Sequence, residues 1–277
     1  MSDTLFRMAG ERQDERMQAV AIATQLDYYY FQGTNEDSVI HYTNKVKEFA
    51  KATHQPKYYY FAWANRLITY YLKTSRTNIA LYEVQNMLKE AQEEDDKTGL
   101  SRCYNIMSQI YTIKRFDSMA FEWRLKEIEL TEKYKIENYN ISQTYAQIAN
   151  YYINQKKQKE ALAAVEKAIA TANSSTQQIS AKLEFVNYYS KFGDFQAAEK
   201  LLKECQAAFE QDKRLESIKK RLYNIECLYY QQTKQYPKAL EAAKMQEKEE
   251  RRLSESILSS SHYRTQGEIY QKMGNMN

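Results

Sequence analysis

The chain has 277 residues, of which 40 are basic and 36 are acidic, and 43% are hydrophobic. A net charge of +4 is too small for a surface that follows nucleic-acid phosphates, so we expect no nucleic-acid partner. Only 6 glycines and 2 prolines interrupt this length, which predicts long helices joined by short turns.

The predicted elements, taken in chain order, are helices separated by short polar links. Residues 1–14 are polar, and we expect them to fray or to cap the first helix. A helical run leads to Tyr30, and a turn at 32–37 with a capping residue precedes the next helical run. Pro56 and Pro237 each suit the first turn of a helix. The alternation continues to the end, and no strand-like pattern competes with it.

A row of tyrosines sets the phase of this alternation. The ladder tyrosines are Tyr30, Tyr71, Tyr111, Tyr152, Tyr189, Tyr230 and Tyr270, at steps of 41, 40, 41, 37, 41 and 40 residues. Nine residues after each of the first six stands a small or β-branched residue: Val39, Ala80, Ala120, Ala161, Ala198 and Ala239. A fixed period near 40 is the signature of a solenoid of helix pairs. We expect each tyrosine to be buried between one pair and the next.

The units resemble tetratricopeptide repeats (TPRs), in which an aromatic residue, a small residue, a tyrosine and a later alanine recur. The fourth unit matches best, with Tyr145, Ala149, Tyr152, Ala161 and Ala168. The resemblance implies an all-α fold, a right-handed α-solenoid of antiparallel helix pairs forming a TPR-like superhelix. We expect a single array over residues 1–277, with units near 16–55, 56–96, 97–137, 138–174, 175–213, 214–254 and 255–277. The last unit is truncated in the turn before its second helix.

The period is longer than the roughly 34 residues of the common repeat. We expect the extra residues to lengthen the second helix of each pair. In the third unit, Arg124 and Glu127 stand where apolar residues are usual, so its second helix is expected to be shifted. The long form looks like the arrays of bacterial peptide-sensing regulators and the sensory TPR regions of bacterial signalling proteins such as sensor histidine kinases.

No pattern in the sequence indicates catalysis or a bound cofactor. The 3 histidines are far apart in the repeat order, and no H-E-x-x-H, glycine-rich nucleotide loop or G-x-S-x-G is present. Cys103, Cys205 and Cys227 form no C-x-x-C pair, and the last two occupy positions predicted to be small and buried. We therefore predict a non-enzymatic protein with no cofactor and no metal. No apolar run of about 18 residues is present, so we expect no membrane insertion by this segment.

The ladder phase also selects a polar face. In such arrays the first helices line the concave surface, and positions six and two before each tyrosine share one helix face. The predicted site comprises Asn65, Asn105, Gln109, Asn150, Asn187 and Asn224 on that face, flanked by Arg102, Arg221, Asn154 and Lys191. An amide both donates and accepts hydrogen bonds, so it can hold a peptide unit from the side. We interpret this face as a groove for a protein or an extended peptide; the alternative is an ordinary solvated surface.

Two functions follow from these expectations. The first is a protein- or peptide-binding module that forms the sensory or scaffolding region of a larger bacterial signal-transduction protein, in a periplasmic or other extracytoplasmic location. The truncated last unit favours this interpretation. The alternative is a complete cytoplasmic TPR adaptor or peptide-responsive regulator. Formation of a homo-oligomer is left open by the sequence.

Overall fold

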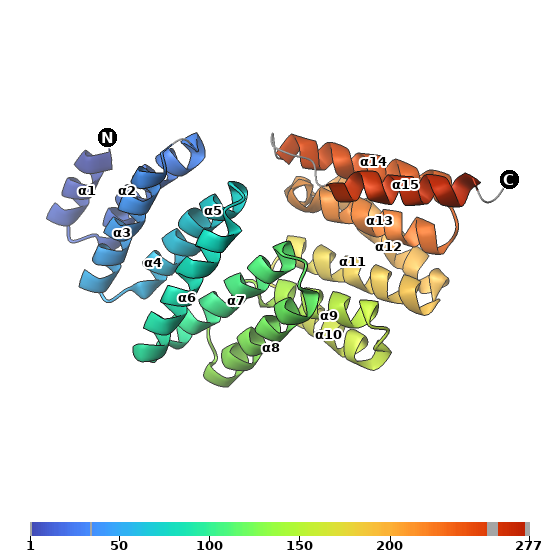
Figure 1. Ribbon diagram of the computed structural model, residues 1–277, viewed down its shortest axis with the longest axis horizontal. Coiled ribbons are helices and arrows are strands. Elements are labelled where there is room, and N and C mark those ends of the chain that lie inside the picture. The colour runs from blue at the N-terminus through green and yellow to red at the C-terminus, as the bar shows by residue number, and fades with distance from the viewer. Residues whose placement is uncertain (1, 34, 254–259, 275–277) are drawn as a thin grey trace. The chain divides into compact units, whose positions relative to one another are not determined.

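The structure, a computed structural model, describes residues 2–33, 35–253 and 260–274, and these form helices and turns (Figure 1). Consecutive helices pack against one another as antiparallel pairs, which confirms the predicted all-α solenoid of helix pairs. The chain divides into two compact units, Met1–Ile136 and Glu137–Asn277. The division falls at the predicted boundary between the third and fourth repeats. The single array over residues 1–277 stays a prediction.

The first unit begins with α1 (Ser2–Glu11), which packs on α2 and so covers the end of the first pair. Three pairs follow. They are α2 (Glu15–Gln32) with α3 (Glu36–Ala52), the continuous helix α4 (Pro56–Ala62), η1 (Trp63–Ile68) and α5 (Thr69–Lys73) with α6 (Thr77–Glu93), and α7 (Lys97–Ile113) with α8 (Asp117–Tyr134). The segment η1 is a π-helix within an otherwise α-helical rod.

The described residues of the second unit form three pairs and one further helix. They are α9 (Ile141–Asn154) with α10 (Gln158–Ala170), α11 (Ser175–Phe192) with α12 (Phe195–Gln211), α13 (Lys219–Gln232) with α14 (Tyr236–Leu253), and finally α15 (Ser260–Gly274). A short 3-10 helix, η2 (Lys213–Ile218), leads into α13. Within the described residues, none of the helices combines the length and the apolar character needed to cross a bilayer.

The local start signals predicted from the sequence are present. The Asn35 side chain accepts a hydrogen bond from the backbone nitrogen of Ser38 at 3.0 Å and so caps α3. Pro56 is the first residue of α4 and Pro237 lies in the first turn of α14, where a missing backbone N–H costs nothing. Each of these residues therefore sets a helix boundary by its own chemistry.

The small residues nine positions after the ladder tyrosines are buried where helices pack against one another. Val39, Ala80, Ala120, Ala161, Ala198 and Ala239 are each at most 1% exposed. The thiols of Cys103, Cys205 and Cys227 are free and buried, and burial raises the pKa of Cys205 to about 11. The predicted role of Cys205 and Cys227 as small buried hydrophobes is confirmed.

The ladder tyrosines are less buried than the sequence predicts. Tyr30 and Tyr71 are buried, whereas Tyr270 is 51% exposed, so its predicted burial is wrong. Tyr111, Tyr152, Tyr189 and Tyr230 are half-buried. In the third, fifth, sixth and seventh units the residue one position earlier is buried instead: Ile110, Tyr188, Tyr229 and Ile269. The rings of the half-buried tyrosines therefore cover the contact between helices from outside and keep their hydroxyls near water.

Two further expectations are wrong. The two helices of a pair are similar in length in most pairs, with 18 and 17 residues for α2 and α3 and 17 and 18 for α7 and α8, so the long period is not confined to the second helix. The pair of α13 and α14 differs, with 14 and 18 residues. The shortest step, 37 residues, coincides with the short helices α9 and α10, of 14 and 13 residues. Helix α8 is also not shifted, because Ala120 stays buried at 1% exposure.

Instead of moving, α8 buries its polar residues within hydrogen bonds. Glu127 is 1% exposed and accepts from Asn105 Nδ2 at 3.2 and 3.1 Å. Arg124, 7% exposed, donates from Nη2 to Thr112 Oγ1 at 2.7 Å. Burial lowers the pKa of Arg124, and the neighbouring Glu127 opposes this shift. Paired polar groups can stay inside a helix pair at modest cost, so no register change is needed.

The turns between helices share a left-handed backbone conformation that the sequence does not predict. A residue with φ between 52° and 67° closes nearly every turn from Gln13 to Lys156, at steps of 20 or 21 residues: Gln13, Gly33, His54, Ser75, Asp95, Arg115, Lys135 and Lys156. Only one of these eight is glycine. The left-handed conformation reverses the chain and directs the next helix back along the previous one.

Candidate functional site

The four predicted site residues of the first unit lie on two helices. Arg102, Asn105 and Gln109 share one face of α7, and Asn65 lies half-buried in η1. Gln109 Nε2 donates to Asn105 Oδ1 at 2.7 Å, and Asn105 in turn holds the buried Glu127. Burial lowers the pKa of Arg102, and Glu127 opposes the shift. Asn105 therefore has a structural task besides any contact with a partner.

Of the six predicted residues of the second unit, four lie on α9 and α11 and two lie on α13. Asn150 and Asn154 hydrogen-bond each other on α9 at 2.9 Å, and Lys191 is exposed near the C-terminal end of α11. Asn187 is 8% exposed and donates to Glu184 at 3.4 Å. Arg221 and Asn224 lie on α13 and, alone among the ten, line a hollow of this unit.

This hollow, here called the second-unit groove, has a volume of about 670 Å³ and lies at the N-terminal ends of α9, α11 and α13, with one residue from α14. Its lining is rich in amides and hydroxyls. The amides are Asn140, Gln143, Gln177, Asn224 and Gln246, and the hydroxyls are Ser142, Ser174, Thr176, Ser180 and Ser217. Ala146, Ala181 and Ile218 supply apolar surface, and Lys220 and Arg221 supply the charge.

The groove follows the repeat phase. Nine residues before their ladder tyrosines stand Gln143, Ser180 and Arg221, and all three line it. Twelve residues before stand Asn140, Gln177 and Ile218, which line it as well. Positions three apart share a helix face. The groove therefore lies nearer the helix starts than the predicted face, which is centred six and two residues before each tyrosine.

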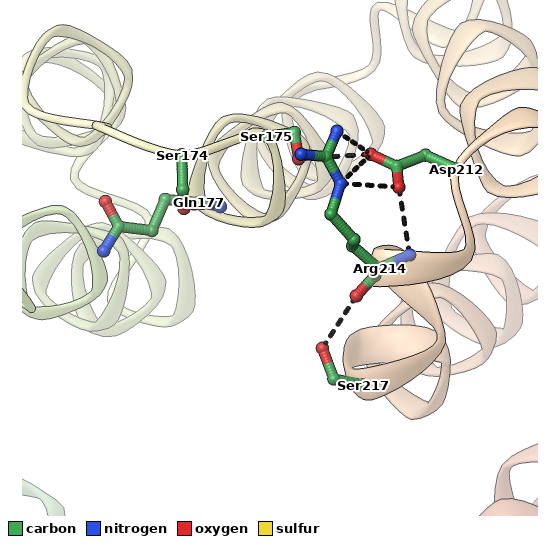
Figure 2. Close-up of polar contacts among 6 residues, drawn as sticks. All are labelled: Ser174, Ser175, Gln177, Asp212, Arg214 and Ser217. Atoms are coloured by element: carbon green, nitrogen blue, oxygen red, sulfur yellow. Dashed lines mark hydrogen bonds and ion pairs between the residues drawn. The ribbon is translucent and has the colours of Figure 1, made fainter.

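Next to the residues that line the groove, Asp212 holds Arg214 and Ser175 by hydrogen bonds, and this cluster is here called the carboxylate clasp (Figure 2). Asp212 Oδ1 accepts from the backbone nitrogen and from Nε of Arg214, both at 2.9 Å, and Oδ2 accepts from Arg214 Nη2 at 2.8 Å. Ser175 Oγ at the start of α11 donates to Asp212 Oδ2 at 3.2 Å. Hydrogen bonds from Arg214 lower the pKa of Asp212 to about 2. The clasp thus ties the start of α11 to the link that carries Ser217.

Further hydrogen bonds hold the start of α11 and the α9 side of the groove. Ser174 Oγ accepts from the backbone nitrogen of Gln177 at 3.3 Å and caps the helix (Figure 2). Gln177 Nε2 then donates to the carbonyl oxygen of Tyr139 at 2.6 Å, before α9. Ser142 Oγ donates to the carbonyl oxygen of Ala168 at 2.7 Å. These side chains shape the groove and are already engaged.

A partly buried ion pair joins α11 and α13 at the groove. Arg221 Nη2 donates to Glu184 Oε1 at 2.6 Å, and only 5% of the Glu184 side chain is exposed. Arg221 Nε is buried and has no partner among the described residues. The pair anchors the arginine by one edge of its guanidinium group.

Other lining groups are free for a ligand. Among the residues that the structure describes, none hydrogen-bonds the side chains of Gln143, Thr176, Ser180, Asn224 or Gln246. They come from α9, α11, α13 and α14, so one ligand in the groove can contact four helices. In the same described part of the chain, no cluster of three or more His, Cys, Asp or Glu side chains is placed to hold a metal ion.

No protein-family model and no curated protein matches the chain. Its structure is similar to that of BtubC (BKLC) from P. vanneervenii, with a TM-score of 0.56 and 15% identity over 82% of this chain and 95% of that one. It is also similar to PilW, a widely conserved type IV pilus biogenesis factor, with a TM-score of 0.50 and 17% identity over 76% and 84%. The TPR2AB domain of yeast Sti1 in its pHSP90 complex matches with a TM-score of 0.34 and 14% identity over 92% and 97%. At these identities the first two likenesses show the fold alone, a TPR-like α-solenoid.

Proposed function

We propose that the chain is a non-enzymatic module that binds a protein, or an extended peptide, in the second-unit groove. The observation that supports this proposal is the set of five free amide and hydroxyl side chains on four helices. These groups both donate and accept hydrogen bonds, and an extended backbone offers both kinds of partner along its length. Packed helices lie about 8–10 Å apart, so three of them span about six extended residues.

The remaining predicted residues are proposed as additional contacts. Arg102, Asn105 and Gln109 present a polar face on α7 in the first unit, with Asn65 on η1. Asn150, Asn154, Asn187 and Lys191 lie farther along the first helices of the second unit than the groove does. A ligand longer than the groove would meet these side chains next.

We also propose the setting in which such a module acts. The period near 40 residues resembles that of sensory TPR regions, so the chain is proposed as the sensory or scaffolding part of a bacterial signal-transduction protein, outside the cytoplasm. The ligand would then be the signal, or a protein that carries it.

The test compares matched triple variants on an array of ten-residue peptides. Gln143→Ala, Ser180→Ala and Asn224→Ala together remove three free groove groups, while Gln196→Ala, Gln211→Ala and Gln232→Ala remove three exposed amides outside it. Since each hydrogen bond contributes roughly 0.5–1.5 kcal/mol, the groove variant should bind about tenfold more weakly or worse. The control should bind like the unmodified protein. Equal binding by both variants would contradict the proposal.

A further inference from the structure

The charge in the second-unit groove is all of one sign. Lys220 and Arg221 are its charged lining residues, and no Asp, Glu or aromatic side chain stands among the described residues that line it. Both cations lie at the start of α13, and the α9 and α11 parts of the lining are uncharged. The groove therefore has a basic end and a neutral end.

Each cation has a carboxylate partner that leaves donors unused. Lys220 Nζ lies 3.1 Å from Glu250, and Arg221 Nη2 lies 2.6 Å from Glu184. The cationic side chains are 40% and 26% exposed, whereas the two carboxylates are only 21% and 5% exposed. An ammonium group has three N–H donors and a guanidinium group has five, so one carboxylate does not satisfy either cation. The surface offered to a ligand is thus the positive side of both pairs.

Resting on the proposed function, we propose that the second-unit groove selects an acidic segment of a partner polypeptide. A side-chain carboxylate of that segment binds Lys220 and Arg221 at the α13 end. The adjoining backbone lies along α11 and α9, where Ser180 and Gln143 are free to hydrogen-bond it. Charge-assisted hydrogen bonds are roughly twice as strong as neutral ones, so the basic end sets the direction and register of the segment.

Lys219 provides a matched control on the same helix. It is the residue before Lys220, but it does not line the groove, and its ammonium group is paired with Glu216 at 2.9 Å. Lys220→Gln and Lys219→Gln change the net charge of the protein equally. A difference between them therefore reports the groove and not the overall charge.

The experiment uses the full chain and three pooled decapeptide libraries with amidated C-termini. The pools share the same degenerate positions and differ in two fixed central residues, which are Asp-Glu, Asn-Gln or Lys-Arg. Binding to bead-bound pools is measured at low and high salt. We expect the acidic pool to bind about three- to tenfold better than the amide pool, with the advantage reduced by salt.

Lys220→Gln should remove most of the acidic preference, and Lys219→Gln should keep it. Arg221→Gln alone would leave the buried Glu184 without its ion-pair partner. The arginine is therefore tested in the double variant Glu184→Gln and Arg221→Gln, with helicity checked by circular dichroism. Equal binding of the acidic and amide pools would overturn the acidic preference while leaving the peptide groove intact. Failure of all three pools to bind would overturn the peptide groove itself.

Discussion

At the scale of single residues, Gly99 lies at a close contact between helices in the first unit. A Cβ atom there would lie 2.9 Å from Cζ of Tyr60 and 3.1 Å from Cβ of Ala91. The Tyr60 hydroxyl donates to Asp96, whose other oxygen accepts from the backbone nitrogens of Thr98 and Gly99 at 2.9 and 3.0 Å. The missing side chain thus permits both the helix contact and the cap of α7.

Gly99→Ala should lower the free energy of unfolding. Alanine favours a helix over glycine by about 1 kcal/mol, but overpacking a tight contact costs about 1–3 kcal/mol. The added methyl group would also push the Tyr60 ring away from Asp96 and weaken the cap. We expect a net loss of about 1–2 kcal/mol, measured by urea denaturation.

The same substitution at Gly267 is the control. Gly267 lies inside α15, and a Cβ atom there would meet nothing within 4 Å. Gly267→Ala should therefore raise the stability by up to about 1 kcal/mol. If both variants were stabilised, the contact of Gly99 with Tyr60 would not constrain the structure.

At the scale of helices and turns, the left-handed residues offer a direct test of backbone strain. Lys156 has φ of 58° in the turn between α9 and α10, and its exposed side chain forms no interaction with the described residues. Side chains disfavour this conformation by about 1–2 kcal/mol, and glycine does not. After the greater freedom of glycine in the unfolded chain is allowed for, Lys156→Gly should stabilise the protein by about 1 kcal/mol in thermal unfolding.

Lys200→Gly removes the same charge from the interior of α12, where the backbone is helical and the lysine is exposed. Glycine within a helix costs about 1 kcal/mol, so this variant should be destabilised. Opposite signs at positions 156 and 200 would attribute the effect to the backbone. A destabilised Lys156→Gly would show that the turn does not carry the expected strain.

The helix pairs could be predicted because small residues recur at one phase, and those positions are buried in all six complete units. The burial of the ladder tyrosines was not predicted correctly, because a large ring with a hydroxyl can cover a contact between helices from outside as well as fill it. The left-handed turns could not be predicted, because residues such as His54, Arg115 and Lys156 carry no glycine signal. Their conformation follows from the packing of the helices on either side.

Of the ten predicted site residues, Arg221 and Asn224 line the second-unit groove. The repeat phase contained the signal for Gln143 and Ser180, which stand nine residues before their tyrosines, as Arg102 and Arg221 do. The link residue Ser217 and Gln246 of α14 could not be found in this way. Their place depends on how η2 and the Asp212 clasp fold the chain before α13.

At the scale of the whole molecule, each unit has its own hydrophobic core. The core of the first unit extends from Leu26 through Trp63 to Ile110. The second unit has one cluster around Leu183 and Ile225 and another around Ala239, Ala243 and Ile269. In a solenoid, stability is approximately the sum of the stabilities of the repeats and of their nearest-neighbour interfaces. Three pairs with a shared core are enough to expect independent folding.

We therefore expect the fragments Met1–Ile136 and Glu137–Asn277 each to fold. Both should show helical circular dichroism and cooperative thermal unfolding, and the second fragment should retain the peptide binding of the groove. A control fragment that ends at Arg115 removes α8 and exposes the buried side of α7, including Cys103 and Ile110. Because a helix pair cannot bury its apolar face with one member missing, this fragment should unfold at lower temperature. An unfolded Met1–Ile136 or Glu137–Asn277 fragment would show that folding requires the whole chain, and that the two cores are not thermodynamically separate.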